Sequence, residues 1–356
     1  MKIKKLHIEN YKSLVNFEIN EPNPFTVFVG PNGSGKSNIF EALQFLNFSY
    51  KYNYSEAVKV FGDQQNILNY STDERYLTFE LNYFNFPSKL DIRFFEDDTG
   101  DNSKKDLSFN LGSLTIATNF KKDSKEKSNR EFIYDRSSGK YSYDNEIEQF
   151  QENFLRLFVN NYNIQKIKSL TDTSLASDAS NLETVLKRVF ENKNTRAEIT
   201  EWLQLFVPDF EKIEIRTSDL SGNSEMAIYE KTLKKPLTKN LISDGTYNIL
   251  ALITAVFQYD EPQFLCIEEP ENGLHPYVIR ELVKFFRQQC EEKGHYIWLN
   301  THSQTLVDEL QPHEIILVDK KEGATQIKQF SKDKNLHGLK MDFAWLSNSL
   351  GGGVPW

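Results

Sequence analysis

The sequence predicts an α/β fold in which helices cover a buried parallel sheet, and three observations support this class. Residues 25–29 and 264–268 are short and almost wholly apolar, as are strands that are buried on both faces. Apolar residues recur at helical spacing after each of these segments. A glycine-rich turn over residues 30–37 joins the first strand to its helix. We therefore expect residues 1–85 and 211–330 to form one α/β unit that an insertion interrupts.

The elements between and after these segments follow from the period of their apolar residues. Residues 86–145 predict a β-rich lobe, because segments such as KLDIRFF have strand character between polar turns. Residues 146–210 predict a helical insertion, with apolar residues three and four positions apart until Pro208 ends the pattern. After residue 241 the chain alternates between helices and apolar strands. Residues 331–356 form a tail whose three glycines, 351–353, predict a flexible hinge.

Composition limits the class of protein further. Of the 356 residues, 39% are hydrophobic and 26% are charged, which is typical of a globular chain and excludes a fibrous or wholly disordered one. The net charge of -9 argues against a protein that coats nucleic acid non-specifically, although it allows a local basic patch. Two cysteines exclude a disulfide framework and a cysteine-based metal site. The longest apolar stretch, residues 249–257, is too short for a membrane span, so we expect a soluble, cytoplasmic protein with no membrane partner.

Residues 30–37, GPNGSGKS, fit the phosphate-loop pattern G-x-x-x-x-G-K-[ST]. In such a loop the glycines let successive backbone N–H groups face the phosphates. Lys36 would pair with the β- and γ-phosphate oxygens, and the hydroxyl of Ser37 would bind Mg²⁺. The loop follows a buried strand and precedes a helix, which favours a nucleotide site over a simple turn. The ATP-binding residues that we expect here are Gly30, Asn32, Gly33, Ser34, Gly35, Lys36, Ser37 and Asn38.

Two carboxylates, Glu268 and Glu269, end the second buried strand. In a nucleotide hydrolase the first carboxylate holds Mg²⁺ through water and the second polarises the attacking water. His302 follows the apolar segment 296–300, and the carboxyl ends of parallel strands meet at one edge of a sheet. We therefore expect Glu269 and His302 to be catalytic, with His302 sensing a γ-phosphate, and Glu268 to hold the metal together with Ser37.

The segment LISDGT, residues 241–246, opens a long helix and has two interpretations. In the simpler one, Ser243 is only a helix N-cap. In the other, the hydroxyl of Ser243, the N–H of Gly245 and the helix N-terminus form a second anion site. One chain rarely needs two phosphate sites for one nucleotide. In a dimer, however, each protomer can cover the γ-phosphate of the other.

Together these motifs resemble the ABC-type ATPase heads of the RecF, SMC, Rad50 and OLD group, and most of all the stand-alone AAA-15/AAA-21 ATPases of prokaryotic defence systems. The resemblance rests on five motifs in the expected order: IENYKSL, GPNGSGKSN, LISDGTYNILAL, CIEEPENGLHP and NTHS. It covers about half of the chain. It implies an ABC-type P-loop ATPase head with a mixed β lobe and a helical insertion, and it implies ATP and Mg²⁺ as cofactors.

The resemblance also assigns roles to residues. It implies Walker A at Gly30–Ser37, Walker B at Glu268 with catalytic Glu269, and the switch histidine at His302. It further implies a signature that acts in trans, formed by Ser243, Asp244 and Gly245, and a D-loop formed by Glu271, Asn272 and Gly273. Lys12 lies where relatives often carry a basic residue near the nucleotide, although a solvated loop lysine fits equally well. Gln64 and Gln65 are candidates for the Q-loop, Gln64 as a metal ligand, but the sequence around them follows no firm pattern.

For function, the resemblance implies a homodimeric switch in which two protomers sandwich two ATP–Mg²⁺, with higher oligomers left open. The switch would control a separately encoded effector, a nuclease or a toxin, in anti-phage defence, and Trp356 in the tail could anchor such a partner. Alternatives are a RecF-like DNA-repair ATPase and an ATP-binding scaffold with negligible turnover. We expect no intrinsic nuclease, because about 36 residues after Lys320 are too few for a Toprim domain. The long insertion and the SDGT signature argue against a transporter subunit.

Contact with DNA is the remaining open question of the sequence. Several lysines could build a basic face, but lysine clusters are more often solvated surface. The candidates are Lys2, Lys4, Lys5, the stretch 121–130, Lys231, Lys234, Lys235 and Lys239.

Overall fold

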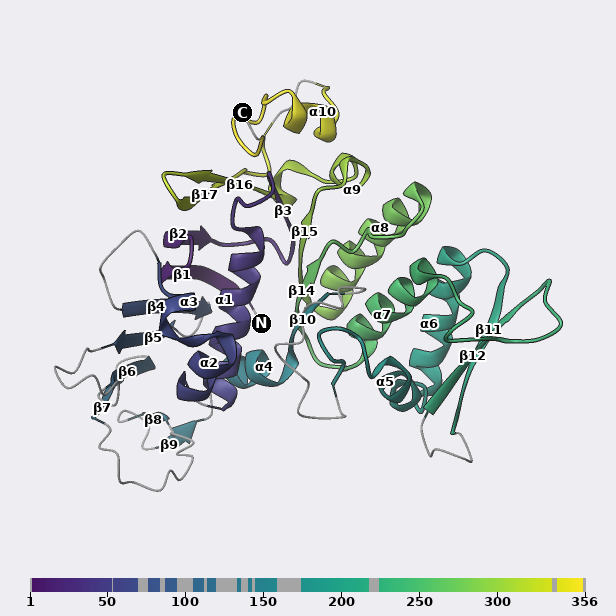
Figure 1. The fold of residues 1–356 in the computed structure, drawn as a ribbon, viewed down its shortest axis with the longest axis horizontal. Coiled ribbons are helices and arrows are strands. Elements are labelled where there is room, and N and C mark those ends of the chain that lie inside the picture. Colours follow the sequence, from purple (N-terminus) through teal and green to yellow (C-terminus); the bar gives the residue numbers. More distant parts are fainter. Residues whose placement is uncertain are drawn as a thin grey trace.

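The structure is a computed structural model of the 356-residue chain, and its elements are drawn in Figure 1. The part that it describes is residues 2–52, 54–69, 76–83, 87–94, 105–111, 114–119, 133–135, 140–142, 145–158, 174–217, 224–334 and 338–354. For the described residues between 87 and 142, only the backbone is described. Among the helices of this part, none combines the length with the apolar composition that a membrane crossing requires.

A six-stranded core sheet organises the fold, in the order β10-β14-β15-β3-β16-β17. All of its pairings are parallel except the last, in which β17 runs antiparallel to β16. The strands are β3 (Phe25–Val29), β10 (Phe154–Leu157), β14 (Phe264–Glu268), β15 (Tyr296–Thr301), β16 (Ile315–Lys321) and β17 (Ala324–Gln329). Because β3 lies between β15 and β16, the glycine-rich loop that follows it emerges next to the strand that carries His302.

Alternate residues of the core strands feed two separate hydrophobic clusters, as the pleat of a strand requires. Phe28 and Trp298 pack towards α1 (Lys36–Lys51), and Val27 and Leu299 pack towards the opposite face. That opposite face is covered by α7 (Asp244–Phe257) and α8 (Pro276–Lys293), which lie on the right of the sheet in Figure 1. Both faces are therefore buried, which explains why β3 is apolar at every position.

A second, antiparallel sheet lies on the α1 side, in the order β2-β1-β4-β5-β6-β7. Its strands are β1 (Ile3–Tyr11), β2 (Leu14–Asn20), β4 (Tyr76–Tyr83), β5 (Pro87–Phe94), β6 (Lys105–Leu111) and β7 (Leu114–Asn119), and a separate pair is β8 (Ile133–Asp135) with β9 (Lys140–Ser142). The β character expected for residues 86–145 is thus present. The boundary at residue 85 stays a prediction, since β4 pairs with β5 across it.

The other elements flank these two sheets. The helices are α2 (Tyr54–Phe61), α3 (Asp63–Ile67), α4 (Asn145–Asn153), α5 (Leu182–Val189), α6 (Lys193–Phe206), α9 (Gln304–Asp308), the 3-10 turn η1 (Pro312–Glu314) and α10 (Met341–Leu346). A three-stranded sheet contains β11 (Phe210–Thr217), β12 (Ser224–Glu230) and β13 (Leu237–Thr238).

The prediction of an all-helical insertion over residues 146–210 is wrong at Phe154–Leu157. Helix α4 ends at Asn153, and the next four residues form β10, which pairs with β14 at the edge of the core sheet. The segment FLRLF fits both periods, because its apolar residues also occur at every second position. Pairing with the buried strand β14 favours the strand over the helix. The edge strand of the core sheet therefore comes from the middle of the chain.

Candidate functional site

The glycine-rich loop is fixed in place by the strands beside it. Gly35 has φ 105°, a conformation that favours glycine, and a Cβ at this position would lie 2.0 Å from Oγ1 of Thr325 in β17. That threonine hydroxyl donates to the carbonyl of Ser34 at 2.8 Å and contacts the hydroxyl of Ser13 at 2.7 Å. The amide of Asn38 donates to the same Ser13 oxygen at 2.8 Å. The β1–β2 turn and β17 therefore hold the loop from one side.

Lys36 closes the loop on itself. Its side chain is buried, and its Nζ donates to the carbonyls of Gly30 at 2.8 Å and Pro31 at 3.0 Å. Burial lowers the pKa of Lys36 to about 8, although the charges of Glu269 and Glu268 act in the opposite direction. An ammonium that is partly stripped of water and held among backbone carbonyls can bind an anionic phosphate strongly.

Glu268, at the end of β14, is the centre of a polar cluster. The hydroxyl of Ser37 donates to its Oε2 at 2.7 Å, and the amide of Asn300 donates to the same oxygen at 3.0 Å. The Nε of Arg156, from β10, donates to Oε1 at 2.7 Å. The side chain of Glu268 is only 11% exposed. The two residues that the sequence predicts as metal ligands, Ser37 and Glu268, are thus in direct contact.

The predicted catalytic pair lies beside this cluster at the same sheet edge. Nε2 of His302 is 4.0 Å from Oε1 of Glu269, and both side chains are accessible, at 37% and 47%. Partial burial, together with the charge of Lys36, lowers the pKa of His302, so the imidazole is neutral at pH 7. The backbone N–H of Glu269 donates to Asn300 Oδ1 at 3.1 Å, which fixes the residue at φ 47°.

Hydrogen bonds of the predicted D-loop join it to Glu269 and to the end of β15, where His302 follows. The amide of Asn272 donates to Oε2 of Glu269 at 3.0 Å. The carboxylate of Glu271 accepts from the hydroxyl of Thr301, and from the backbone N–H of His302 at 3.3 Å. Burial raises the pKa of Glu271. Gly273 (φ 74°) brings its carbonyl to 2.6 Å from where a Cβ of Gly245 would lie, so the D-loop touches the predicted signature.

The signature segment itself is exposed at the start of α7. Ser243 is the N-cap, and its hydroxyl accepts from the N–H of Thr246 at 3.1 Å. Ser243 and Asp244 are exposed, and no hydrogen bond or ion pair among the described residues joins them to the glycine-rich loop of the same chain. The structure thus contains the N-cap of the simpler interpretation, and the anion site in trans stays a prediction.

No hydrogen bond or ion pair among the described residues joins Lys12 to the cluster around Glu268. Lys12 lies in a turn at φ 49° and forms an ion pair with Glu41 of α1, so it is not a freely solvated lysine. Gln64 belongs to α3, but its side chain lies outside the described part of the structure. The neighbouring Gln65 is exposed. Their roles at the nucleotide remain predictions.

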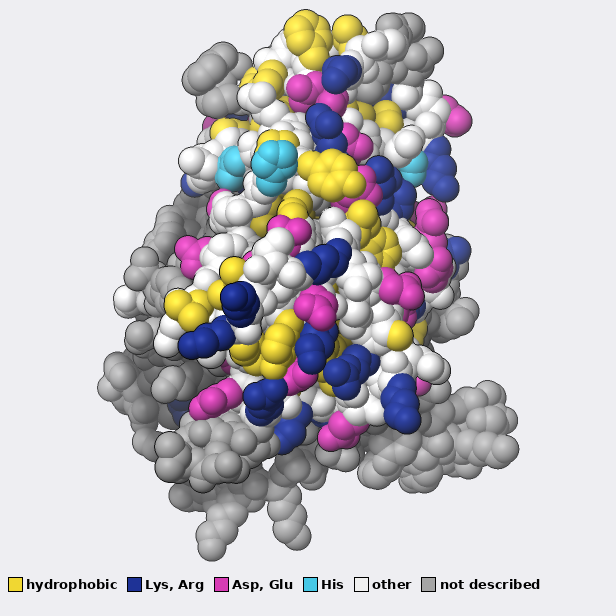
Figure 2. Space-filling view, turned by 90° about the vertical axis from the view of Figure 1, so that its right-hand side faces the viewer, with side chains coloured by type: hydrophobic (Ala, Val, Ile, Leu, Met, Phe, Trp, Pro, Cys, Tyr) yellow, Lys and Arg dark blue, Asp and Glu magenta, His cyan; other side chains and the backbone are white. Residues whose placement is uncertain are grey.

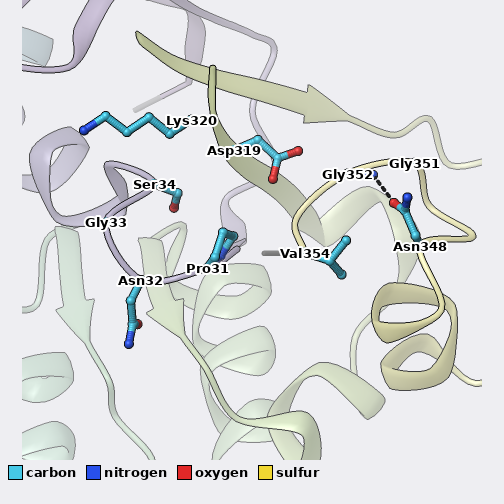
Figure 3. Close-up of a pocket in the computed structure, with 10 residues that line it drawn as sticks. All are labelled: Pro31, Asn32, Gly33, Ser34, Asp319, Lys320, Asn348, Gly351, Gly352 and Val354. Carbon is cyan, nitrogen blue, oxygen red and sulfur yellow. Dashed lines mark hydrogen bonds between the residues drawn. The ribbon is translucent and has the colours of Figure 1, made fainter. Parts of the chain in front are cut away.

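The prediction of a flexible glycine hinge in the tail is wrong for residues 351–353. The N–H of Gly353 donates to both carboxylate oxygens of Asp319 at 2.8 Å, and its carbonyl accepts from Nε1 of Trp345 at 2.7 Å. Figure 3 shows the N–H of Gly352 bonded to Asn348 as well. All three glycines have positive φ, which glycine alone adopts easily, so they make a tight, fixed turn. Trp356 lies outside the described residues.

This turn forms one wall of a hollow beside the glycine-rich loop (Figure 3). The hollow has a volume of about 520 Å³. Its opposite wall is formed by residues 31–34 of the loop, and Asp319 and Lys320 of β16 also line it. The lining residues are Pro31, Asn32, Gly33, Ser34, Asp319, Lys320, Asn348, Gly351, Gly352 and Val354.

The comparison with known families decides what this arrangement is. The family described as "AAA domain, putative AbiEii toxin, Type IV TA system" matches residues 25–308, which include the glycine-rich loop, the carboxylate pair and the histidine. The chain belongs to this AAA-21 family. It is therefore a member of an ATPase family, and the order and chemistry of its motifs agree with that membership.

Curated relatives agree with the family. A Helicobacter pylori protein named "ATP/GTP phosphatase" is 20% identical over 355 residues, which cover 92% of this chain and 91% of that protein. The chromosome partition protein Smc of Methanocaldococcus jannaschii is 46% identical over 44 residues, 12% of this chain and 4% of that protein. The DNA replication and repair protein RecF of Clostridium botulinum is 25% identical over 97 residues, 27% of this chain and 25% of that protein.

Solved structures define the fold of this AAA-21 protein. An Smc head bound to the C-terminal winged-helix domain of ScpA aligns with a TM-score of 0.58 at 16% identity, over 93% of this chain and 98% of that one. The Smc head of Pyrococcus furiosus, with an extended coiled coil, aligns with a TM-score of 0.54 at 13% identity, over 93% and 97%. The fold is that of an ABC-type ATPase head, as the sequence predicts.

The residues present fit a nucleotide with a magnesium ion. Among the described residues no group of three or more His, Cys, Asp and Glu side chains could enclose a metal by itself. The site offers instead one hydroxyl and one carboxylate, Ser37 and Glu268, beside a phosphate loop. Mg²⁺ characteristically takes one or two protein oxygens and completes its shell with substrate phosphates and water. The donor set therefore suits this ion.

Sequence reasoning missed Arg156 and Asn300, which hold Glu268, and Thr325, which holds the loop. The sequence did contain a sign of the role of Arg156: a lone charge inside the apolar run FLRLF needs a partner if the run is buried. Asn300, the residue before Thr301 and His302, could have been suspected from its place at the end of an apolar strand. Thr325 had none, since its role depends on how β17 folds back on β16.

Proposed function

We propose that this protein is a cytoplasmic, Mg²⁺-dependent ATPase that works as a dimeric switch. One observation carries the proposal: Ser37 at the start of α1 and Glu268 at the end of β14 are 2.7 Å apart, with Lys36 buried beside them. A hydroxyl, a carboxylate and an ammonium meet at one sheet edge although 231 positions separate the first two. This is the arrangement that binds and cleaves a nucleoside triphosphate.

The side chains at this edge divide the work of hydrolysis. The N–H groups of the glycine-rich loop and Lys36 bind the β- and γ-phosphates. Ser37 and Glu268 hold Mg²⁺, which when bound neutralises charge that develops on the phosphate oxygens. Glu269 accepts a hydrogen bond from the attacking water and orients it, while Asn272 holds the carboxylate. Neutral His302 donates a hydrogen bond to the γ-phosphate.

The exposed signature supports the dimeric form of the proposal. Ser243 and Gly245 sit at the N-terminus of a 14-residue helix, whose orphan N–H groups favour an anion. In a head-to-tail pair, these residues of one protomer cover the γ-phosphate that is held by the loop of the other. Closure would exclude water from the site, and hydrolysis would open it. Assemblies beyond the dimer are compatible with this arrangement.

The proposed output of the switch is control of a second protein. The family description names a putative AbiEii toxin of a type IV toxin–antitoxin system, which supports a role in anti-phage defence with a separately encoded effector, a nuclease or a toxin. We expect no DNA cleavage by the protein itself, because its described strand-end carboxylates Glu268 and Glu269 are committed to the nucleotide. Incubating pure protein with DNA and Mg²⁺ or Mn²⁺ tests this, and cleavage that survives Lys36→Ala would contradict it.

A RecF-like role in DNA repair is the second candidate, and the similarity to RecF over 97 residues favours it. Figure 2 shows Lys and Arg side chains gathered on the lower half of the side on which β11 and β12 lie in Figure 1, with carboxylates among them. Two candidate basic residues are already paired, Lys5 with Glu18 and Lys239 with Glu183. Stimulation of ATP hydrolysis by double-stranded DNA at physiological salt would favour this candidate over defence.

The ATPase proposal is tested by comparing wild-type protein with Lys36→Ala. We expect Mg²⁺-dependent release of phosphate from ATP by the wild type, and a loss of at least about 100-fold in the variant, because the charge that binds and neutralises the phosphates is removed. Circular dichroism and melting temperature control for folding. Equal phosphate release by a well-folded variant would place hydrolysis elsewhere or in a contaminant.

A further inference from the structure

Arg156 belongs to none of the sequence motifs, yet it contacts both predicted metal ligands, Glu268 and Ser37. Its side chain is only 8% exposed, and its guanidinium joins β10 to two other elements, β14 and α1. Nε and Nη2 both donate to Oε1 of Glu268 on β14. Nη2 also donates to the carbonyl of Ser37, and Nη1 donates to Oε1 of Gln44 on α1, each at 3.2 Å. The ring of Phe158 covers the guanidinium, 4.3 Å from its centre to Cζ.

The two oxygens of Glu268 have different partners. Oε1 is held by Arg156, while Oε2 accepts from the hydroxyl of Ser37 at 2.7 Å and from Asn300 at 3.0 Å. A hydroxyl that donates its hydrogen to a carboxylate keeps its lone pairs for another partner. The ion pair with Arg156 therefore orients Glu268, and Glu268 in turn orients the hydroxyl of Ser37. One lone pair of that hydroxyl accepts from Asn300 at 3.4 Å, and the other is available at the exposed side of Ser37.

We propose that Arg156 is a positioning residue of the Mg²⁺ site: it fixes Glu268 and Ser37 so that Mg²⁺ increases the affinity for nucleotide. This inference rests on the proposed ATP–Mg²⁺ site and adds a residue that acts through the predicted metal ligands, Glu268 and Ser37. A planar guanidinium can hold a carboxylate and two carbonyl oxygens at once, which an ammonium cannot. Partners that orient metal ligands in this way typically change metal affinity 10- to 100-fold when they are removed.

A second Arg–Glu pair, with a partly buried arginine and a buried glutamate, provides a matched control. Arg287 of α8 donates to the two oxygens of Glu314 in η1 at 2.7 and 2.9 Å, and Glu314 is 4% exposed. This pair joins two elements as the first one does. No hydrogen bond or ion pair among the described residues joins Arg287 or Glu314 to the glycine-rich loop or to β14. Arg287→Met therefore removes a comparable ion pair without touching the predicted metal site.

The experiment measures how much Mg²⁺ improves nucleotide binding. The dissociation constant of a fluorescent, non-hydrolysable ATP analogue is determined with Mg²⁺ and with EDTA, for the full chain and for Arg156→Met, Arg156→Lys and Arg287→Met. The readout is the ratio of the two constants, which a general loss of stability does not change. Melting temperatures are recorded in parallel.

We expect Arg156→Met to lower this ratio about tenfold, with a change of less than about threefold in EDTA. Arg156→Lys keeps the charge but not the fork, so an intermediate ratio is expected, and this variant carries the test if the methionine variant does not fold. Arg287→Met should keep the wild-type ratio even if its melting temperature falls.

Three results would overturn the inference. A wild-type ratio in both Arg156 variants would make the pair merely structural. Equal weakening with Mg²⁺ and with EDTA would assign Arg156 to the nucleotide rather than to the metal site. A loss of the ratio in Arg287→Met as large as that in Arg156→Met would show that any broken ion pair has this effect. A wild-type protein that gains nothing from Mg²⁺ would instead refute the proposed ATP–Mg²⁺ site itself.

Discussion

The carboxyl edge of the core sheet and the first turn of α7 are both candidate phosphate sites, yet they are held very differently. At the sheet edge, Ser37, Glu268 and Arg156 contact one another across more than a hundred residues of sequence. At the start of α7, Ser243 bonds only within its own turn and faces solvent. The side chains of the first site contact one another within one chain. The second site has its hydrogen-bond donors in place, but it needs a phosphate that another protomer holds.

Of the changes that distinguish the two regions, Glu269→Gln at the sheet edge should have the largest effect on ATP turnover. The substitution keeps the size and the contact with Asn272 but removes the charge that orients water, so turnover should fall by about 10²- to 10⁴-fold. ATP binding should persist, because Lys36, Ser37 and Glu268 are unchanged. Phosphate release and mass in solution with ATP are measured. A trapped dimer would support the proposal, and unchanged turnover would remove Glu269 from the catalytic role.

The comparison between the two regions is tested most directly by mixing variants. Lys36→Ala damages the sheet edge, and Ser243→Arg damages the start of α7. If Ser243 acts in trans, each homodimer is inactive, whereas a mixed dimer has one doubly damaged site and one intact site. We expect mixing to restore up to about half of the wild-type rate in the mixed dimers, provided that one site can work alone.

The control for mixing is each variant at twice its concentration. Rescue on mixing would show that the two regions belong to different protomers of one site. If Ser243 acted in cis, every site would carry a lesion and no activity would return. Light scattering of the mixture, with and without ATP, confirms that mixed dimers form.

A smaller effect is expected from pH, and only at the sheet edge. Burial lowers the pKa of Lys36 from its usual value of 10.5 to about 8, and a bound phosphate favours the charged form. Nucleotide affinity should therefore be full below pH 8 and should fall above it, by up to about tenfold per pH unit as the free protein loses this proton. Titrations between pH 7 and 9.5 measure the slope. Arg at position 36 should flatten it, and a slope that persists in Lys36→Arg would exclude Lys36 as its source.

The smallest effect is expected from the tail turn, which borders the loop on its outer side. Deleting residues 351–356 removes the hydrogen bonds from Gly353 to Asp319 and leaves that carboxylate less well paired. We expect the melting temperature to fall by a few degrees and ATP turnover to stay within a few-fold. Asp319→Asn, which keeps a weaker acceptor, should have less effect. Complete loss of turnover would mean that the turn shapes the phosphate loop.

How far the sequence could predict these regions depends on where each contact partner lies. The glycine-rich loop, the carboxylate pair and His302 were predictable, because each motif sits next to the strand or helix that positions it. Arg156 was not, since its role arises only when β10 pairs with β14. The flexible hinge predicted for the glycines at 351–353 was wrong for the same reason. Glycine permits both a loose hinge and a tight turn, and Asp319 and Trp345 select the turn.

The position of β3 in the core sheet has a consequence for synthesis of the chain. This strand is translated early, yet its neighbours β15 and β16 follow it by more than about 260 residues. At about 5–20 residues per second, a fully apolar strand and its glycine-rich loop wait on the order of 10–60 s for partners. During that interval the antiparallel β1–β2 hairpin and α1 can form locally, but the nucleotide site cannot. Until β15 and β16 have been made, the nascent protein exposes an apolar strand that favours aggregation or chaperone binding, and the nucleotide site can form only after them.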